Sequence, residues 1–152
     1  MEINIKSDKY FMEKALQEAH KALDADEVPV GAIITYENEI ISRGYNYVEH
    51  LNDVTAHAEM QAFTSAADYI GGKYLNGCTL YVTLEPCLMC IGAINHARIN
   101  RVIFGAPDSK NKVLGSSENL ILKPFLNDSC SFDGGILEEE CKEILQSFFK
   151  KK

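Results

Sequence analysis

The chain has 152 residues, of which 46% are hydrophobic and 24% are charged. These proportions are ordinary for a globular protein, and this length buries a core without disulfide or metal staples, so residues 1–152 are expected to form a single domain. The formal net charge of −7 excludes a protein that binds nucleic acid through overall positive charge. It leaves room for a local basic patch, such as the closing "FFKKK".

The sequence carries no pattern of a membrane span or of an export signal. No hydrophobic run approaches the roughly 18 residues of a transmembrane helix. The opening "MEINIKSDKYFMEKAL" lacks the basic and then apolar order of a secretory signal. The five cysteines are an odd number, which argues against a disulfide framework. We expect a cytoplasmic protein with reduced thiols and no membrane partner.

The first part of the chain predicts a helix followed by two strands. An amphipathic helix is indicated by apolar residues at three- and four-residue steps: Met12, Ala15, Leu16, Ala19, Ala22 and Leu23. This helix should end before Pro29, which cannot continue it. Residues 28–36 and 39–46 are typical of two strands joined by a short polar turn. The first strand is almost continuously apolar and should be buried on both faces.

A polar loop at residues 46–55 separates these strands from a second predicted helix. The helix should start between Thr55 and His57 and run to about Tyr69, before the break at "GG". Thr55 is its expected N-cap by residue type. Three residues are expected to face inward: Met60, Phe63 and Ala67.

The second half of the chain predicts a strand–helix–strand unit and a final helix. Residues 78–84 and 101–106 read as strands on either side of "EPCLMCIGAINHARI", so they should run parallel. Residues 107–133 are the least regular, with "LILKPFL" as a short helix or a turn. The last helix has an apolar stripe made of Leu137, Cys141, Ile144, Leu145 and Phe148. The predicted class is a single α/β domain.

Two of the cysteines stand in a chemically suggestive pattern, "PCLMC". Taken alone, Cys87 and Cys90 are compatible with a redox pair, with two buried thiols or with metal ligands. Pro86 suits the first turn of a helix, on which both sulfurs would share one face and be favoured as thiolates. The remaining three cysteines are expected to fill the core: Cys78, Cys130 and Cys141.

The stretch "VTAHAEM" adds a histidine and a glutamate to this pattern. His57 would supply a third N or S ligand from another helix start, a set that suits Zn²⁺. Three protein ligands leave a coordination position for water, as in a catalytic site. Glu59 can then move the proton of a water whose pKa the zinc lowers to about 7.

Two other interpretations of these residues stay open. A redox pair would not need His57 or Glu59. A structural zinc site would need a fourth ligand, for which the sequence offers His50, His96 and Cys78, none at a familiar spacing.

"HAE" followed by "PCLMC" resembles the signature of the zinc-dependent nucleobase deaminase superfamily. The similarity continues through "DEVPVGAII", "TLYVTLEPCLMCIGAI", "RVIFGA" and "GILEEECKEILQSFFKKK", so it covers most of the chain. Within this superfamily the chain is most similar to the bacterial tRNA adenosine deaminases. It departs from them at Val54, where proline is usual, and at Lys112, where glycine is frequent.

The resemblance implies a fold and a site. The fold would be a three-layer α/β/α cytidine-deaminase-like arrangement around a central, mostly five-stranded mixed sheet, assembled as a homodimer. One zinc ion per subunit would be bound by His57, Cys87 and Cys90, with Glu59 as the catalytic proton shuttle. Asn46 would hydrogen-bond the purine, and the backbone around Ala58 and Pro86 would lie near the reacting ring. In the basic tail, Phe148 is expected to pack in the core, whereas Phe149 would be free to meet RNA.

The resemblance also implies a reaction, the hydrolytic deamination of the wobble adenosine of an arginine tRNA anticodon loop to inosine. A splayed, single-stranded loop suits this chemistry. The alternative is deamination of a free nucleobase or nucleoside of the guanine or cytosine type, which the acidic charge favours. A third hypothesis is a zinc-stabilised binding protein without catalysis, which would have no use for Glu59.

Overall fold

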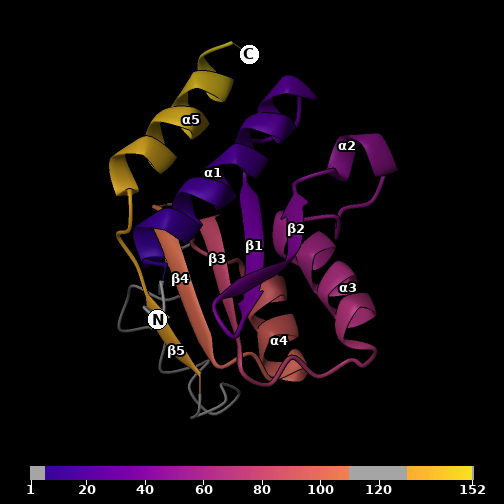
Figure 1. The fold of residues 1–152 in the computed structure, drawn as a ribbon. Helices are drawn as coiled ribbons and strands as arrows, with labels where there is room; N and C mark the ends of the chain where they lie inside the picture. Colours follow the sequence, from indigo (N-terminus) through magenta and orange to yellow (C-terminus); the bar gives the residue numbers. More distant parts are fainter. Residues whose placement is uncertain (1–5, 110–129, 152) are drawn as a thin grey trace.

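A computed structural model describes residues 6–109 and 130–151 of the protein (Figure 1). The helices and strands follow one another along the chain in this order: α1 (Asp8–Asp24), β1 (Gly31–Tyr36), β2 (Glu39–Tyr45), α2 (Val48–Leu51), α3 (Ala58–Ile70), β3 (Cys78–Leu84), α4 (Leu88–Ala97), β4 (Arg101–Ala106), β5 (Ser131–Asp133) and α5 (Glu138–Lys150). The predicted strands and long helices are all present. The predicted helix or turn at "LILKPFL", like Lys112, lies outside the described residues.

The strands form one mixed sheet in the order β2-β1-β3-β4-β5. β1 pairs antiparallel with both β2 and β3, whereas β3, β4 and β5 are parallel neighbours. This confirms the predicted hairpin, the parallel strand–helix–strand unit and the mixed five-stranded sheet. The prediction of an irregular segment at 107–133 was wrong at its end, where three residues form β5 beside β4.

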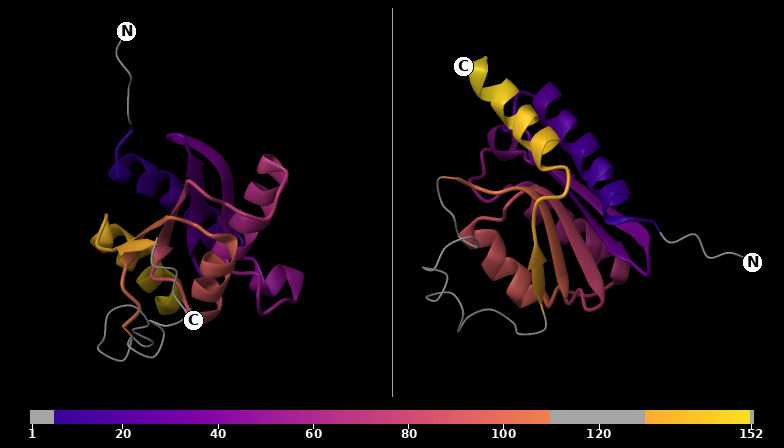
Figure 2. Two further views of the ribbon diagram at one scale, coloured as in Figure 1. Left: turned by 90° about the horizontal axis from the view of Figure 1, so that it is seen from below. Right: turned by 90° about the vertical axis from the view of Figure 1, so that its left-hand side faces the viewer.

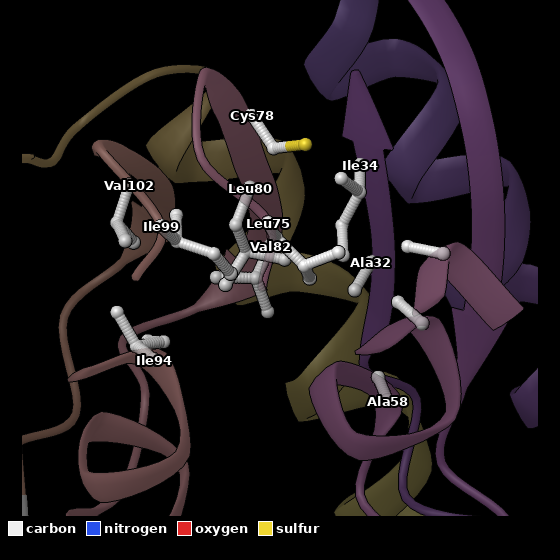
Figure 3. Close-up of a cluster of buried hydrophobic side chains, with 12 residues drawn as sticks. Ala32, Ile34, Ala58, Leu75, Cys78, Leu80, Val82, Ile94, Ile99 and Val102 are labelled. Carbon is white, nitrogen blue, oxygen red and sulfur yellow. The ribbon is translucent and has the colours of Figure 1, made fainter. Parts of the chain in front are cut away.

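Helices cover both faces of the sheet, as Figure 2 shows: α1 and α5 lie side by side on one face, and α4 lies on the other. Side chains alternate between the faces along each strand. Ile33, Tyr81 and Ile103 pack with α1 and Cys141 of α5. Their strand neighbours pack with α3 and α4 in a second cluster: Ala32, Ile34, Leu80, Val82 and Val102 (Figure 3). The fold therefore has the predicted three layers.

The helix α3 lies unusually close to the edge strand β2. A Cβ atom on Gly44 would stand 2.5 Å from the Ala58 carbonyl oxygen and 2.7 Å from the Ala62 nitrogen, so only glycine fits there. The buried stripe of α3 is accordingly made of small residues, Ala58, Ala62 and Ala66. The predicted inward set is confirmed for Phe63, which is partly buried and packs against the core cluster. It was wrong for Met60 and Ala67, which are only half-buried and lie outside that cluster.

The start of α3 also differs from the prediction. His57, not Thr55, is the N-cap, with an extended backbone and no capping side-chain hydrogen bond. The Thr55 hydroxyl instead donates to Asp53 at 2.7 Å, and the Thr55 amide donates to the same carboxylate oxygen at 2.9 Å. The turn that precedes α3 is therefore held by hydrogen bonds between Thr55 and Asp53. Because the His57 side chain makes no capping hydrogen bond, it is available for another partner. In the described ranges, no helix has the length and apolar character that crossing a membrane requires.

Candidate metal centre and substrate cavity

The sheet register brings four loops together at one edge. β3 and β4 both end there, and because β1 is antiparallel to β3, the start of β1 and the end of β2 lie at the same edge. A cavity of about 850 Å³ lies at this edge. Its lining comes from the ends of these strands, from α2 and α3 and from both terminal helices: Ala25, Asp26, Glu27, Val28, Val30, Asn46, Val48, Glu49, His50, His57, Ala58, Glu59, Leu84, Glu85, Cys87, Asp108 and Phe148.

Two helix N-termini point their first residues at this cavity. His57 is the N-cap of α3 and Cys87 is the N-cap of α4. Cys90 follows in the first turn of α4, three residues on and therefore on the same face. Pro86 is buried and precedes the N-cap, so the prediction that it stands in the first helical turn was wrong. Both helix dipoles favour negative charge at this point.

Three donor atoms meet between the two helices. His57 Nδ1 lies 3.5 Å from Cys87 Sγ and 3.7 Å from Cys90 Sγ, and all three atoms lie within 4.8 Å of one another. Tetrahedral bonds to one zinc ion, about 2.0–2.1 Å to nitrogen and 2.3 Å to sulfur, place such donors about 3.6 Å apart. The arrangement of these three side chains fits a zinc ion.

The protonation of the two thiols supports the same interpretation. A hydrogen bond from Cys90, assisted by His57 and opposed by burial, lowers the pKa of Cys87 to about 4. The same hydrogen bond, together with burial, raises the pKa of Cys90. The pair therefore shares a proton that a metal cation can replace, since thiolate is the form that binds metal.

Glu59 lies beside these donors and is almost completely buried, with 4% of its surface exposed. Burial raises the pKa of its carboxyl group, while a hydrogen bond with Cys90 and the charge of His57 oppose that rise. Glu59 lines the cavity but is not among the three donors that lie close together. A buried carboxyl group whose pKa is raised, in the lining of a cavity, is suited to accept and return a proton.

Asn46 also lines the cavity. Its side-chain Nδ2 donates to the Val28 carbonyl oxygen at 3.2 Å, which fixes the orientation of the amide. Its Oδ1 atom is buried and accepts no hydrogen bond within the described parts of the chain. Because a buried acceptor without a partner is costly, this atom is suited to a ligand that brings a donor.

The structure brings most of the predicted site residues to one place. Asn46 and Ala58 join His57, Glu59 and Cys87 in the cavity lining. Phe149 is exposed, as the helix geometry predicts, but it is Phe148 that reaches the cavity, with 8% of its surface exposed. Of the described residues, those proposed as a fourth ligand stay outside the donor group: His50, His96 and Cys78.

Sequence reasoning missed two buried carboxylates in the cavity lining. Glu27 accepts hydrogen bonds from the backbone amides of Glu49 and His50, and Glu85 accepts one from the Asp108 amide at 3.2 Å. Although burial raises the pKa of Glu27, these hydrogen bonds and the His50 ring bring it below its ordinary value. Each carboxylate fixes a loop, and no local pattern in the sequence marks that role.

A three-layer α/β/α fold with one histidine and two cysteines at the starts of two helices defines a zinc-dependent nucleobase deaminase. The sequence profile of the cytidine and deoxycytidylate deaminase zinc-binding region matches residues 5–106. The chain belongs to this family and is a zinc-dependent hydrolytic deaminase, which confirms the predicted resemblance and cofactor.

Particular relatives narrow this class. A tRNA-specific adenosine deaminase from Aquifex aeolicus is 50% identical over 142 residues, which are 93% of each chain. The solved structure of a tRNA:A34 deaminase, studied for A-to-I editing at the wobble position, superposes with a TM-score of 0.83 at 42% identity, covering 89% of this chain and 98% of that one. The guanine deaminase from Bacillus subtilis superposes with a TM-score of 0.66 at 35% identity, covering 78% and 76%.

Proposed function

We propose that the protein deaminates the wobble adenosine in a tRNA anticodon loop to inosine, with release of ammonia. The observation that supports deamination is the meeting of three zinc-binding donors and a buried carboxyl group, Glu59, in one cavity. The observation that supports tRNA is the 50% identity, over nearly the whole chain, to a tRNA-specific adenosine deaminase.

In this proposal His57, Cys87 and Cys90 hold the zinc ion, which when bound activates a water molecule at neutral pH. Glu59 takes the proton that this water loses. It delivers this proton to the ring nitrogen beside the amine-bearing carbon. It then takes the second proton, from the hydroxyl group that has been added to that carbon, and delivers it to the amine, which leaves as ammonia while the carbonyl group forms. The raised pKa of Glu59 supports this role, because a shuttle must be able to hold the proton between the two transfers.

Other residues of the cavity lining would orient the purine. Asn46 Oδ1 is the buried acceptor that is available to an N–H group on the edge of the base. The backbone amides of Ala58 and Cys87, at the starts of α3 and α4, would lie near the reacting ring, and Pro86 directly precedes Cys87. A cavity of this volume is ordinary for a ligand of this size, since such sites span roughly 300–1,000 Å³.

We further propose a cytoplasmic homodimer that acts on an arginine tRNA. The RNA contacts must be local, because the net charge is −7. Phe149 is 58% exposed and stands next to Lys150 and Lys151 at the end of α5, which supports a role in RNA binding. The exposed Leu88 and the open space around Gly92 on α4 support an apolar contact with a second copy.

The guanine deaminase neighbour supports a second candidate, the deamination of a free base or nucleoside. The same zinc chemistry serves both candidates, so only the substrate distinguishes them. The decisive experiment offers the zinc-loaded protein an arginine tRNA anticodon stem-loop and, separately, adenosine, guanine and cytosine. We expect inosine only in the stem-loop. Conversion of a free base, with an untouched stem-loop, would favour the second candidate.

A Glu59→Gln variant tests the catalytic assignment in the same assay. We expect it to retain zinc, since Glu59 is not one of the donors, and to lose ammonia release. A variant that retains full activity would refute the shuttle role. A wild-type protein that is inactive on every substrate would favour a binding protein instead.

A further inference from the structure

His50 lies in the cavity lining with its imidazole ring fixed from two sides. Its Nδ1 atom lies 2.6 Å from Glu27 Oε2. Its ring stacks on the Tyr47 ring, with centroids 4.6 Å apart and an interplanar angle of 11°. Tyr47 in turn meets the Tyr45 ring edge-on at 5.6 Å. The three rings form a supported aromatic stack beside the cavity.

Glu27 holds the backbone that carries this stack. Its carboxylate is 1% exposed and accepts the backbone N–H of Glu49 at 3.0 Å and of His50 at 2.8 Å. A buried carboxylate is costly unless such donors surround it, so these bonds tie α2 to one position. The start of the loop is tied separately, because the Tyr47 amide donates to the Ala56 carbonyl oxygen at 2.9 Å. The His50 ring is therefore oriented before any ligand arrives.

The catalytic chemistry does not use His50. It is not part of the donor group formed by His57, Cys87 and Cys90. One face of its ring is covered by Tyr47, yet 43% of the side chain is exposed to solvent. An exposed, oriented ring in the lining of this cavity matches the way proteins bind single-stranded RNA, whose unpaired bases stack on aromatic and histidine rings.

We infer that His50, supported by Tyr47, is a stacking platform for a nucleotide adjacent to the one that enters the cavity. The inference rests on the proposed function, because it requires a single-stranded RNA substrate. His50 would then raise the affinity for an anticodon loop and contribute nothing to a free base or nucleoside. Glu27 is its positioning residue, which acts through the hydrogen bonds to His50 and Glu49.

The test measures binding of an anticodon stem-loop that carries 2-aminopurine on one or the other side of the target adenosine. The parent protein is the zinc-loaded Glu59→Gln variant, which binds without turnover. Two substitutions are introduced into this parent. His50→Ala removes the ring, and His50→Phe keeps a flat ring but cannot form the hydrogen bond with Glu27. Thermal unfolding and zinc content are measured for each protein.

We expect 2-aminopurine fluorescence to fall on binding at one of the two positions, for the parent and for His50→Phe. His50→Ala should lose this quenching and bind roughly 5- to 150-fold more weakly, the range that corresponds to one stacked base. Equal weakening by Ala and Phe would show that the bond to Glu27 matters and not the stacking, which would overturn the inference. Undiminished binding by His50→Ala would overturn it too.

Failure of the proposed function has a different signature. In that case the wild-type protein does not deaminate the stem-loop and the parent does not bind it, whatever residue stands at position 50. That result would overturn the proposed function and, with it, the stacking platform. Deamination of the stem-loop with undiminished binding by His50→Ala would overturn the platform alone.

Discussion

The two sides of the cavity are built by different means. The metal wall consists of side chains at the starts of α3 and α4: His57, Glu59, Cys87 and Cys90. The loop wall consists of Asn46 and the α2 segment. Two backbone amides of α2, those of Glu49 and His50, donate hydrogen bonds to the carboxylate of Glu27, which is more than twenty residues earlier in the chain. The first wall is organised by helix geometry and the second by long-range hydrogen bonds.

This difference separates the reaction from the choice of substrate. In the proposed mechanism the metal wall holds the groups that activate water and move a proton, and these would serve any amine-bearing base. The loop wall presents Asn46 Oδ1, Val48 and the His50 ring to whatever enters. Changes in the metal wall should therefore lower kcat and zinc content, whereas changes in the loop wall should mainly raise KM.

The largest effect is expected from breaking the metal wall with Cys90→Ser. This residue is fully buried, and serine keeps its size but removes the thiolate. We expect bound zinc to be lost and deamination to fall by about 10³-fold or more, because water without a metal ion is a poor nucleophile at neutral pH. Elemental analysis and ammonia release measure the two effects. Cys130→Ser is the matched control, since this half-buried thiol is outside the donor group and should retain zinc and activity.

The next effect is expected from Gly44→Ala, which should disturb both walls together. The new Cβ would meet the backbone of α3 at Ala58 and Ala62, which cannot move aside alone. We expect destabilisation of about 1–3 kcal/mol, as is usual for overpacking. A displacement of His57 and Glu59 of about 1 Å should also lower kcat by roughly 10²-fold.

Gly72→Ala controls for the chemical change itself. A Cβ at Gly72 meets no atom within 4 Å, so thermal unfolding and kcat should equal those of the wild type. Equal behaviour of the two variants would contradict the close packing of α3 on β2.

A smaller effect, confined to the loop wall, is expected from Glu27→Ala. Two backbone amides and the His50 ring would lose their acceptor, which costs about 1–3 kcal/mol for each donor left unsatisfied. We expect zinc content to be retained, KM for the stem-loop to rise by about tenfold or more, and the amides of Glu49 and His50 to exchange hydrogen faster. Glu27→Gln keeps one carbonyl acceptor and should lie between the wild type and Glu27→Ala. A loss of zinc would show that the two walls are not separable.

The same contrast decides what could be predicted from the sequence. The metal wall could be predicted from the sequence because its residues stand two and three positions apart at helix starts, a local spacing that is typical of metal ligands and their neighbours. The loop wall was not, because Glu27 in "DADEVP" has the composition of a solvated turn and its partners are more than twenty residues away. Asn46 entered only through the resemblance to a family.

The errors in the fold have similar physical causes. The buried face of α3 was only partly predicted, since Phe63 does pack against the core. Its fully buried alanines were missed because the close approach to Gly44 on a strand, which requires small residues, is not visible in the helix sequence. Thr55 was taken as an N-cap because its residue type fits, but Asp53 is a nearer partner. β5 was missed because its three residues, Ser131–Asp133, are too few for their alternation to predict a strand.

The smallest effect is expected at an ion pair remote from both walls. Asp8 accepts two hydrogen bonds from Arg101, at 2.9 and 2.7 Å, and one from the Tyr81 hydroxyl at 2.7 Å. These residues join the first turn of α1 to the start of β4, whereas the cavity lies where β4 ends. Asp8→Asn should therefore leave KM, kcat and zinc content unchanged while slightly lowering the unfolding temperature at pH 7.

The pH dependence of that difference tests its cause. The hydrogen bond to Arg101 lowers the pKa of Asp8, against the opposing effect of burial. A folded-state pKa below the unfolded one means that ionised Asp8 stabilises the protein above the unfolded value, near pH 4, and that this stabilisation disappears as the pH falls through the folded value. The unfolding temperatures of wild type and Asp8→Asn should begin to converge below about pH 4 and should meet once the pH is below the folded-state pKa of Asp8. If the two unfolding temperatures still differ at a pH below the folded-state pKa of Asp8, the interaction that Asp8→Asn removes is not electrostatic.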